Sequence, residues 1–360
     1  MKSNYLFLLS ALAMFTACNE QETTTSVQEN AVTFKTFVSP QGRGVAASQD
    51  DKANLQQDFG VFAYRNTTGI ADALTPPNTL YNELVTYTPG AGFSYTNTIY
   101  WPANDKLGFY AYSPYSAEGT GANGISNFVP ADNTTNGTPG FTFTVNNDVD
   151  NQIDLLTART EGLSGGTVPL AFLHALSKVE LQAHTSAINY RVAIMGVKLT
   201  GIYSTGDFRF IGLPTSWVNQ RTEADYTGAV LTTGNSQPNN AGVPAAVIVY
   251  NNNSSEYTDV TDPSNALYLL PQALGANARL VVTYNIYNAQ TGNLISNQTS
   301  QDLILDISDE NLTLSGLVKW DRSHRIIYRL NFFPRDSGPG SEIKFEATVT
   351  DWSVEYGDFS

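Results

Sequence analysis

A two-residue alternation of apolar and polar side chains, repeated along most of the 360 residues, is the feature that most constrains the fold. In the segment LVVTYNI (residues 280–286), the even-numbered positions form a continuous apolar face. The segment IKFEATV (residues 343–349) repeats the pattern, with Ile343, Phe345 and Val349 on the apolar side. Successive side chains of a β-strand point to opposite faces, so this period predicts antiparallel sheets with one buried and one solvated face.

Clusters of turn-forming residues separate these short apolar segments, as in TPGAG and NTTNGTPG. No segment has the pattern of a long amphipathic helix. We therefore predict an all-β fold of two antiparallel β-sandwich domains in tandem, of the transthyretin-like or Greek-key kind. The segment HTSAINY (residues 184–190) is the best boundary, which gives an N-terminal domain at 31–187 and a C-terminal domain at 188–360.

The charge balance excludes one class of partner. The chain has 19 Lys and Arg residues against 33 Asp and Glu residues, a net charge of −14. A field of this sign repels nucleic acids and anionic lipid surfaces. Only 14% of the residues are charged and 11% are aromatic, a balance typical of secreted β-proteins.

The N-terminus has the organisation of an export signal. Lys2 precedes an apolar run that ends in the small pair Thr16–Ala17, which predicts a signal peptide at residues 1–17. Cys18 is the single cysteine of the chain, and FTAC resembles the lipobox of bacterial lipoproteins, in which the cysteine carries a lipid. We expect lipidation of Cys18 and a flexible tether at 18–30, and hence an outer membrane lipoprotein precursor; an ordinary signal peptide with an incidental cysteine is the alternative.

Motifs for catalysis or metal binding are weak. Ser164 in GLSGG matches the pattern of a nucleophile elbow, but another strand follows instead of a helix, so a loop serine is the better interpretation. The three histidines do not form a zinc-binding pattern, and DVDNQID (residues 148–154) lacks the glycine and the final glutamate of an EF-hand loop. We expect no catalytic residue, no metal site and no cofactor. The four tryptophans could line a sugar-binding face, although core packing is their commoner role.

Several segments, in order along the chain, resemble the fimbrillin family, the subunits of lipoprotein-derived (type V) pili. These segments are FGVFAY (59–64), YWPANDKLGFYAYSP (100–114), DLLTA (154–158), VPLAFLHALSKVELQ (168–182), LYLLPQ (267–272), HRIIYRLNF (324–332) and ATVTDW (347–352). The resemblance implies a subunit that is exported with its first strand in place, after which a surface protease cuts behind an Arg or Lys. The strand then leaves with the lipid, and a strand from a neighbouring subunit fills the groove.

In this sequence the first strand falls at residues 31–38, where Val32, Phe34 and Val38 alternate with polar residues. The resemblance places the cleavage between Arg43 and Gly44, in a glycine-flanked and accessible segment, so that residues 31–43 are removed. Without the resemblance, Arg43 is a plain linker arginine.

The C-terminal segment has two interpretations. Ile343, Phe345 and Val349 could belong to a strand that is donated to a neighbour, as in a stalk subunit. They could equally belong to the last strand of the chain's own sandwich, which suits a tip or accessory subunit.

The leading functional expectation is a structural subunit of a surface pilus that serves adhesion. Its expected partners are other pilus subunits, in a homo- or heteropolymer, the lipid on Cys18, an Arg-specific surface protease, and a host or bacterial surface glycan or protein. The alternatives are an anchored surface lipoprotein that binds glycans and, third, a secreted hydrolase with a carboxylate pair.

Overall fold

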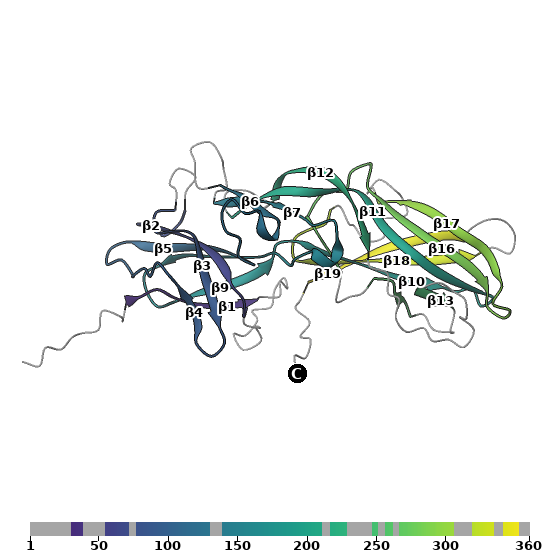
Figure 1. Ribbon diagram of the computed structural model, residues 1–360, viewed down its shortest axis with the longest axis horizontal. Coiled ribbons are helices and arrows are strands. Elements are labelled where there is room, and N and C mark those ends of the chain that lie inside the picture. Colours follow the sequence, from purple (N-terminus) through teal and green to yellow (C-terminus); the bar gives the residue numbers. More distant parts are fainter. Residues whose placement is uncertain are drawn as a thin grey trace, which may run out of the picture.

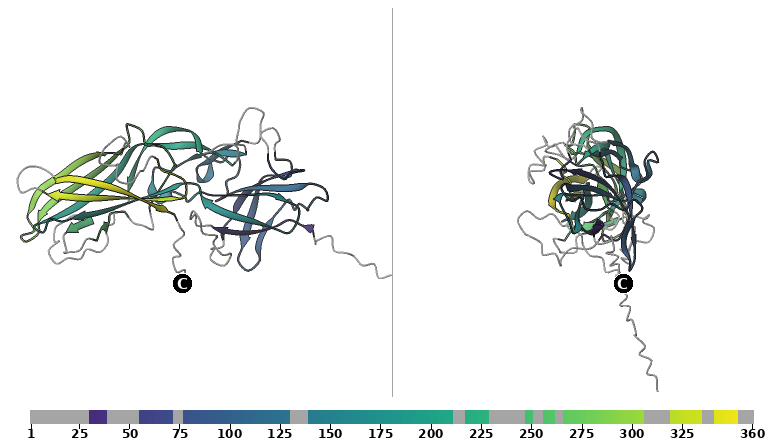
Figure 2. Two further views of the ribbon diagram at one scale, coloured as in Figure 1. Left: turned by 180° about the vertical axis from the view of Figure 1, so that it is seen from behind. Right: turned by 90° about the vertical axis from the view of Figure 1, so that its left-hand side faces the viewer.

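The computed structural model of the chain describes residues 30–38, 55–71, 77–129, 139–210, 217–228, 247–250, 256–261, 266–305, 319–334 and 341–352. Figure 1 shows an elongated molecule with two units along its long axis, and the end-on view in Figure 2 shows that it is narrow across that axis. The described part of the chain is built from strands, with two short 3₁₀ helices, η3 (Ala122–Gly124) and η4 (Val149–Asn151).

The first unit contains one seven-stranded sheet, called here the N-terminal sheet. Its strands, in spatial order, are β1 (Thr33–Val38), β9 (Thr167–His174), β8 (Leu156–Leu163), β5 (Lys106–Ser113), β2 (Phe59–Asn66), β3 (Leu80–Thr88) and β4 (Gly92–Tyr95). The sheet curves strongly, so that the segment after β4 returns to β1. The sheet is therefore nearly closed.

The second unit is a sandwich of two sheets. One contains β14 (Thr258–Asp259), β10 (Ser177–Thr185), β18 (His324–Pro334), β19 (Ser341–Asp351) and β15 (Leu267–Leu269), which pairs with β10. The other contains β17 (Leu294–Ile304), β16 (Arg279–Asn288), β11 (Tyr190–Arg209), β7 (Gly140–Thr144) and β6 (Ile125–Val129), with β12 (Trp217–Gly228) and β13 (Val247–Tyr250) also paired to β11. Inward side chains of both sheets meet in one core, as where the rings of Tyr284 and Phe332 lie 5.2 Å apart.

The strand β11 joins the two units. Its 20 residues span roughly 65 Å, and it pairs with β16 along its first half and with β7 at its end. The β6–β7 hairpin therefore lies beside the N-terminal sheet, and the two strands central to that sheet are buried on both faces. Phe62 and Tyr112 pack into the larger core, while Phe59 and Phe109 on the same strands pack into a separate N-terminal core.

The all-β fold of tandem units agrees with the prediction from the alternation, but the sheets divide earlier than the predicted boundary between residues 187 and 188. β10 precedes that boundary and pairs with β18, and the β6–β7 hairpin joins β11. The segment around 184–190, which has the composition of a linker, is the connection from β10 to β11 and leads from one sheet of the sandwich to the other.

Among the described strands two pairs are parallel, which differs from the predicted antiparallel arrangement. β1 pairs with β9, and β10 pairs with β18, both in parallel. The alternation of side chains is the same in both kinds of sheet, and it carries no information about the direction of the neighbouring strand.

Candidate assembly site

The strand β1 closes the N-terminal sheet by contacts along both of its edges. On one edge, all of its residues pair with β9, from Thr33 opposite Thr167 to Val38 opposite Phe172. On the other side, just before β1 begins, the Val32 amide donates to the Ile99 carbonyl at 2.9 Å, and the Trp101 amide donates to the Asn30 carbonyl at the same distance. β1 is thus the edge strand that brings the N-terminal sheet close to a closed barrel (Figure 1).

The inward face of β1 follows the predicted alternation. Val32, Phe34, Thr36 and Val38 are buried, whereas Thr33 and Lys35 are exposed. The Phe34 ring is the centre of this face, because it makes edge-on contacts with the rings of Phe59 and Phe109, each at 5.7 Å, and with that of Tyr95 at 5.5 Å. The predicted strand residues Val32, Phe34 and Val38 therefore all belong to the N-terminal core.

Three polar contacts hold β1 in register. The Tyr95 hydroxyl donates to the Val32 carbonyl at 2.8 Å, and the Thr36 hydroxyl donates to the Leu55 carbonyl at 2.9 Å. The hydroxyls of Thr33 and Thr167 lie 3.1 Å apart on the outer face. Burial raises the pKa of Tyr95, so its hydroxyl keeps its proton and remains a donor to the strand.

These contacts define what lies beneath β1. Without this strand, the amide and carbonyl groups along one edge of β9 would lose their partners, and an apolar groove lined by Phe59, Phe109 and Tyr95 would be open. Unpaired backbone groups beside an apolar groove are the features that another extended segment can satisfy.

The strand β19 lies at the edge of its own sheet, paired in antiparallel register with β18. Ile343 and Phe345 stand opposite Phe332 and Leu330, and the partly buried Val349 packs against the larger core. The structure thus places β19 in the chain's own sandwich, which is one of the two arrangements left open by the sequence.

The end of β19 is held by an aromatic stack that the sequence did not predict. The Trp352 ring lies 3.7 Å from the His174 ring at an angle of 7°, and 5.2 Å from the Tyr268 ring on another segment. His174 is oriented by a 2.9 Å contact with Asp154, and the Trp352 amide donates to the Ser323 carbonyl at 3.0 Å. These residues are distant in sequence, and no local pattern brings them together.

The remaining predicted residues fall into two groups. Cys18, Arg43 and Gly44 lie outside the described residues, so their predicted roles stay predictions. Ser164 lies in the exposed turn between β8 and β9, and no helix follows it.

Neither a metal centre nor a membrane span is found in the described part of the chain. Its His, Asp and Glu residues form no group of three or more suited to a metal ion. None of its helices is long and apolar enough to cross a bilayer.

Three of the four tryptophans, Trp217, Trp320 and Trp352, are buried, as the core-packing interpretation predicts. Trp101 is partly buried, and its indole N–H donates to the Gly166 carbonyl at 3.1 Å.

Comparisons with known proteins agree with this architecture. A family model described as fimbrillin-like matches residues 46–352, a range that begins beyond β1. The fimbrium subunit Fim1C of Phocaeicola vulgatus is 26% identical over 234 residues, which cover 58% of this chain and 61% of that protein. The match therefore spans less than two thirds of that relative.

A solved structure shows the same fold. The crystal structure of a fimbrial protein from Bacteroides vulgatus ATCC 8482 superposes with a TM-score of 0.57 at 21% identity, over 82% of this chain and 93% of that one.

Proposed function

Because the chain belongs to the fimbrillin-like family, we propose that it is a structural subunit of a cell-surface fimbria, assembled by exchange of β1 for a strand of a neighbouring subunit and serving adhesion. The family is one of fimbrial subunits and not of enzymes. The observation that carries the proposal is the position of β1, a short strand that covers the N-terminal core between β9 and the segment at 99–101.

The precursor begins with the signal peptide at residues 1–17 and a lipid on Cys18, which anchors it at the outer membrane. A surface protease specific for arginine cuts between Arg43 and Gly44. The cut falls between the end of β1 at Val38 and the next described residue, Leu55, so residues up to 43 separate from the rest of the subunit. The family match from residue 46 onward leaves the removed part outside the matched region.

Removal of β1 has a large energetic cost that an incoming strand recovers. Burial of each Val or Phe side chain on its inward face stabilises the barrel by about 1.5–3 kcal/mol. The backbone groups of β9 also lose their partners. A strand that restores both contributions binds tightly, which suits a fibre that must resist mechanical load.

The groove specifies the sequence of its occupant. The inward positions of β1 and of the residue before it are Val32, Phe34, Thr36 and Val38, that is, apolar, aromatic, small and apolar at intervals of two. Residues 343–349 of the same chain have this pattern, with Ile343, Phe345, Ala347 and Val349 at the same spacing. On the basis of this pattern, the proposed donor strand is β19 of a second copy. Its insertion into the groove competes with its pairing to β18 in its own subunit.

Polymer formation tests the proposal. Cells that express the wild-type chain are expected to give ladders on gels run without boiling, because an inserted strand resists detergent. Arg43→Ala removes the cleavage site and is expected to leave only the monomer with an intact lipid. Lys52→Ala, in the same segment, is the matched control and should give normal ladders. Ladders of equal intensity from the Arg43→Ala variant would contradict cleavage at this site, and the absence of ladders from the wild-type chain would contradict polymerisation.

A further inference from the structure

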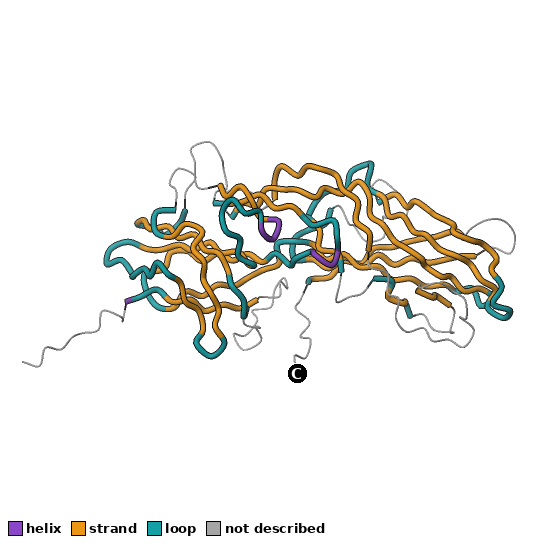
Figure 3. The backbone as a smooth tube through the Cα atoms, in the orientation of Figure 1, coloured by secondary structure: helices purple, strands orange, loops and turns teal. Residues whose placement is uncertain are grey.

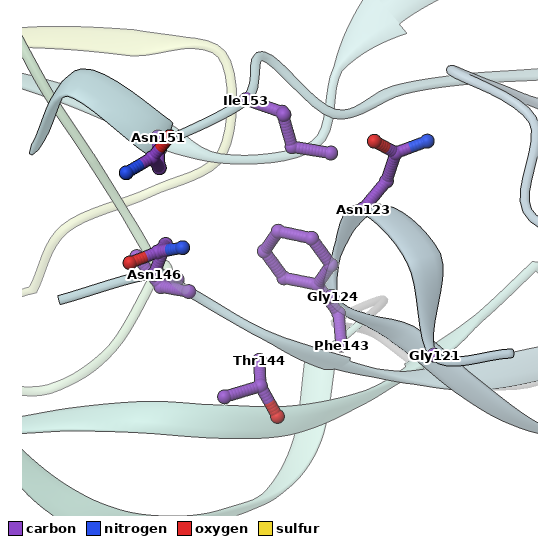
Figure 4. A pocket seen from close by; sticks show the side chains of 9 residues that line it. Gly121, Asn123, Gly124, Phe143, Thr144, Asn146, Asn151 and Ile153 are labelled. Carbon is purple, nitrogen blue, oxygen red and sulfur yellow. The ribbon is translucent and has the colours of Figure 1, made fainter. Parts of the chain in front are cut away.

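A pocket of about 490 Å³ opens beside the β6–β7 hairpin, away from the groove of β1. Its walls are the loop Gly121–Gly124, which contains η3, the end of β7 with the two residues that follow it, and the segment at η4 (Figure 4). The two 3₁₀ helices, purple in Figure 3, lie near the middle of the molecule, where the two units meet. None of the lining residues belongs to β1, β9 or β19.

The wall formed by η3 lies directly against β7. Asn123 and Gly124 have φ angles of 55° and 71°, in the left-handed region. A Cβ atom at Gly124 would lie 2.3 Å from the Thr144 carbonyl oxygen, so a glycine is required for this close approach.

The wall at η4 is fixed by a set of local hydrogen bonds. The Asn146 side-chain oxygen accepts from the Asp148 amide at 2.9 Å, and the Gln152 side chain donates to the Asn146 carbonyl at the same distance. Asp148 in turn accepts from the Asp150 amide and caps η4. Both walls are therefore held in place by contacts within the chain.

The partners of three asparagines fix which of their atoms remain available. The Asn123 amide group donates to the Tyr115 carbonyl, and that of Asn151 donates to the Asp148 carboxylate, which leaves Oδ1 of each as an acceptor. Oδ1 of Asn146 already accepts, which leaves its Nδ2 as a donor. Among the described residues, no other side-chain hydrogen bond uses these three atoms. Figure 4 shows Asn123 and Asn146 on opposite sides of the Phe143 ring.

The chemistry of the lining selects a ligand class. The lining also contains the buried Phe143 and Val145 and the half-buried Ile153, and no lining residue carries a charge. An anionic ligand would meet two acceptor oxygens and, close by, the Asp148 and Asp150 carboxylates, without a cation in the lining to balance it.

A sugar has the matching groups, since its hydroxyls both donate and accept while its C–H face packs on apolar side chains. The volume also lies within the usual range of small-molecule sites, roughly 300–1,000 Å³. We propose that this pocket binds a short neutral saccharide. This activity is separate from strand exchange and would give the fibre a recognition site on each subunit.

Saturation-transfer NMR on the purified full chain tests this site directly. The probes are galactose, N-acetylglucosamine, mannose and maltose as neutral sugars, and glucuronate and glucose 6-phosphate as anionic ones. Saturation transfer to at least one neutral sugar and to neither anion is the expected result. Transfer to none of the neutral sugars, or stronger transfer to the anions, would overturn the proposal.

Matched variants locate the site. Asn146→Ala and Asn151→Ala each remove one atom that faces the ligand, together with the hydrogen bond of that side chain to Asp148. The lost contact with the sugar is expected to weaken binding by about 3- to 10-fold, the effect of one lost hydrogen bond. Asn277→Ala, at an exposed position outside the pocket, is the control and should bind as the wild-type chain does. Unchanged melting temperatures show that all three variants are folded. Equal affinity in all three would place the sugar elsewhere and overturn the assignment.

Discussion

The strands that complete the two units, β1 and β19, are held in different ways. All six residues of β1 pair with β9 in parallel, and on the other side the described backbone hydrogen bonds join the residues just before β1 to the short segment at 99–101. All eleven residues of β19 pair with β18 in antiparallel register, and Trp352 continues from it into the stack with His174.

The difference indicates which strand is replaceable. Parallel pairing is slightly less stable per residue than antiparallel pairing, and β1 is the shorter strand. At the same time β1 covers the apolar core beneath it. Under the proposed exchange, the N-terminal unit would accept a strand into that groove, whereas the C-terminal unit would donate its own, more firmly held strand only at a higher cost.

The largest expected effect is at the centre of the β1 face. Phe34→Ala removes the ring that touches Phe59 and Phe109 and is expected to lower the free energy of unfolding by about 3–5 kcal/mol. Lys35→Ala, on the exposed face of the same strand, should change it by less than about 0.5 kcal/mol. Urea unfolding of the full precursor measures both, and equal small changes would show that β1 does not seal the core.

A pair of tryptophan variants tests whether β1 and β19 are stabilised independently. Trp352→Ala removes the stack on His174 and is expected to cost about 3 kcal/mol and to accelerate hydrogen exchange in β19 but not in β1. Trp101→Ala removes the contact with Phe109 and should accelerate exchange in β1 but not in β19. Faster exchange of both strands in either variant would contradict their independence.

Alkaline pH is expected to lower the free energy of unfolding through Tyr112, which lies on a strand that contributes side chains to both cores. Burial raises the pKa of Tyr112 on β5 above the value of about 10 that it has in the unfolded chain. Below pH 10 this phenol is protonated in both states. Above pH 10 the unfolded chain ionises first, so the free energy of unfolding falls, by up to about 1.4 kcal/mol per pH unit for this group.

The Tyr112→Phe variant isolates this contribution. It should show a shallower fall between pH 10 and 11 than the wild-type chain in urea unfolding. An identical slope would mean that ionisation of the Tyr112 hydroxyl does not contribute to the loss of stability at alkaline pH.

The smallest effect is expected from loss of the hydrogen bond between the Tyr95 hydroxyl and the Val32 carbonyl. Tyr95→Phe removes the hydrogen bond to the Val32 carbonyl and should destabilise the precursor by about 1 kcal/mol. Tyr87→Phe is the control, because no described hydrogen bond involves the Tyr87 hydroxyl, and it should have no measurable effect. A larger loss in the control would contradict the role of Tyr95.

The alternation at 31–38 was sufficient to predict which residues of β1 face inward, because that pattern is local. It could not predict that β1 runs parallel to β9 or that Ile99–Trp101 closes the other edge, because a single bridge is too short to leave a pattern. For the three histidines the sequence shows only that they lack a zinc-binding pattern; the pairing of His174 with Asp154 and its stacking on Trp352 depend on contacts between distant segments. Likewise, a turn between sheets and a domain linker have the same composition, so the connection from β10 to β11 resembled a boundary.

The N-terminus of the protein released from intact cells by surface proteolysis, determined by mass spectrometry, tests the exchange of β1 most directly. A mature chain that begins at Gly44 is the predicted result, because it means that the lipid and β1 have left and that the groove is open to a neighbour. A lipidated Cys18 on all of the protein would contradict the exchange, because β1 would then remain in the N-terminal sheet of every subunit.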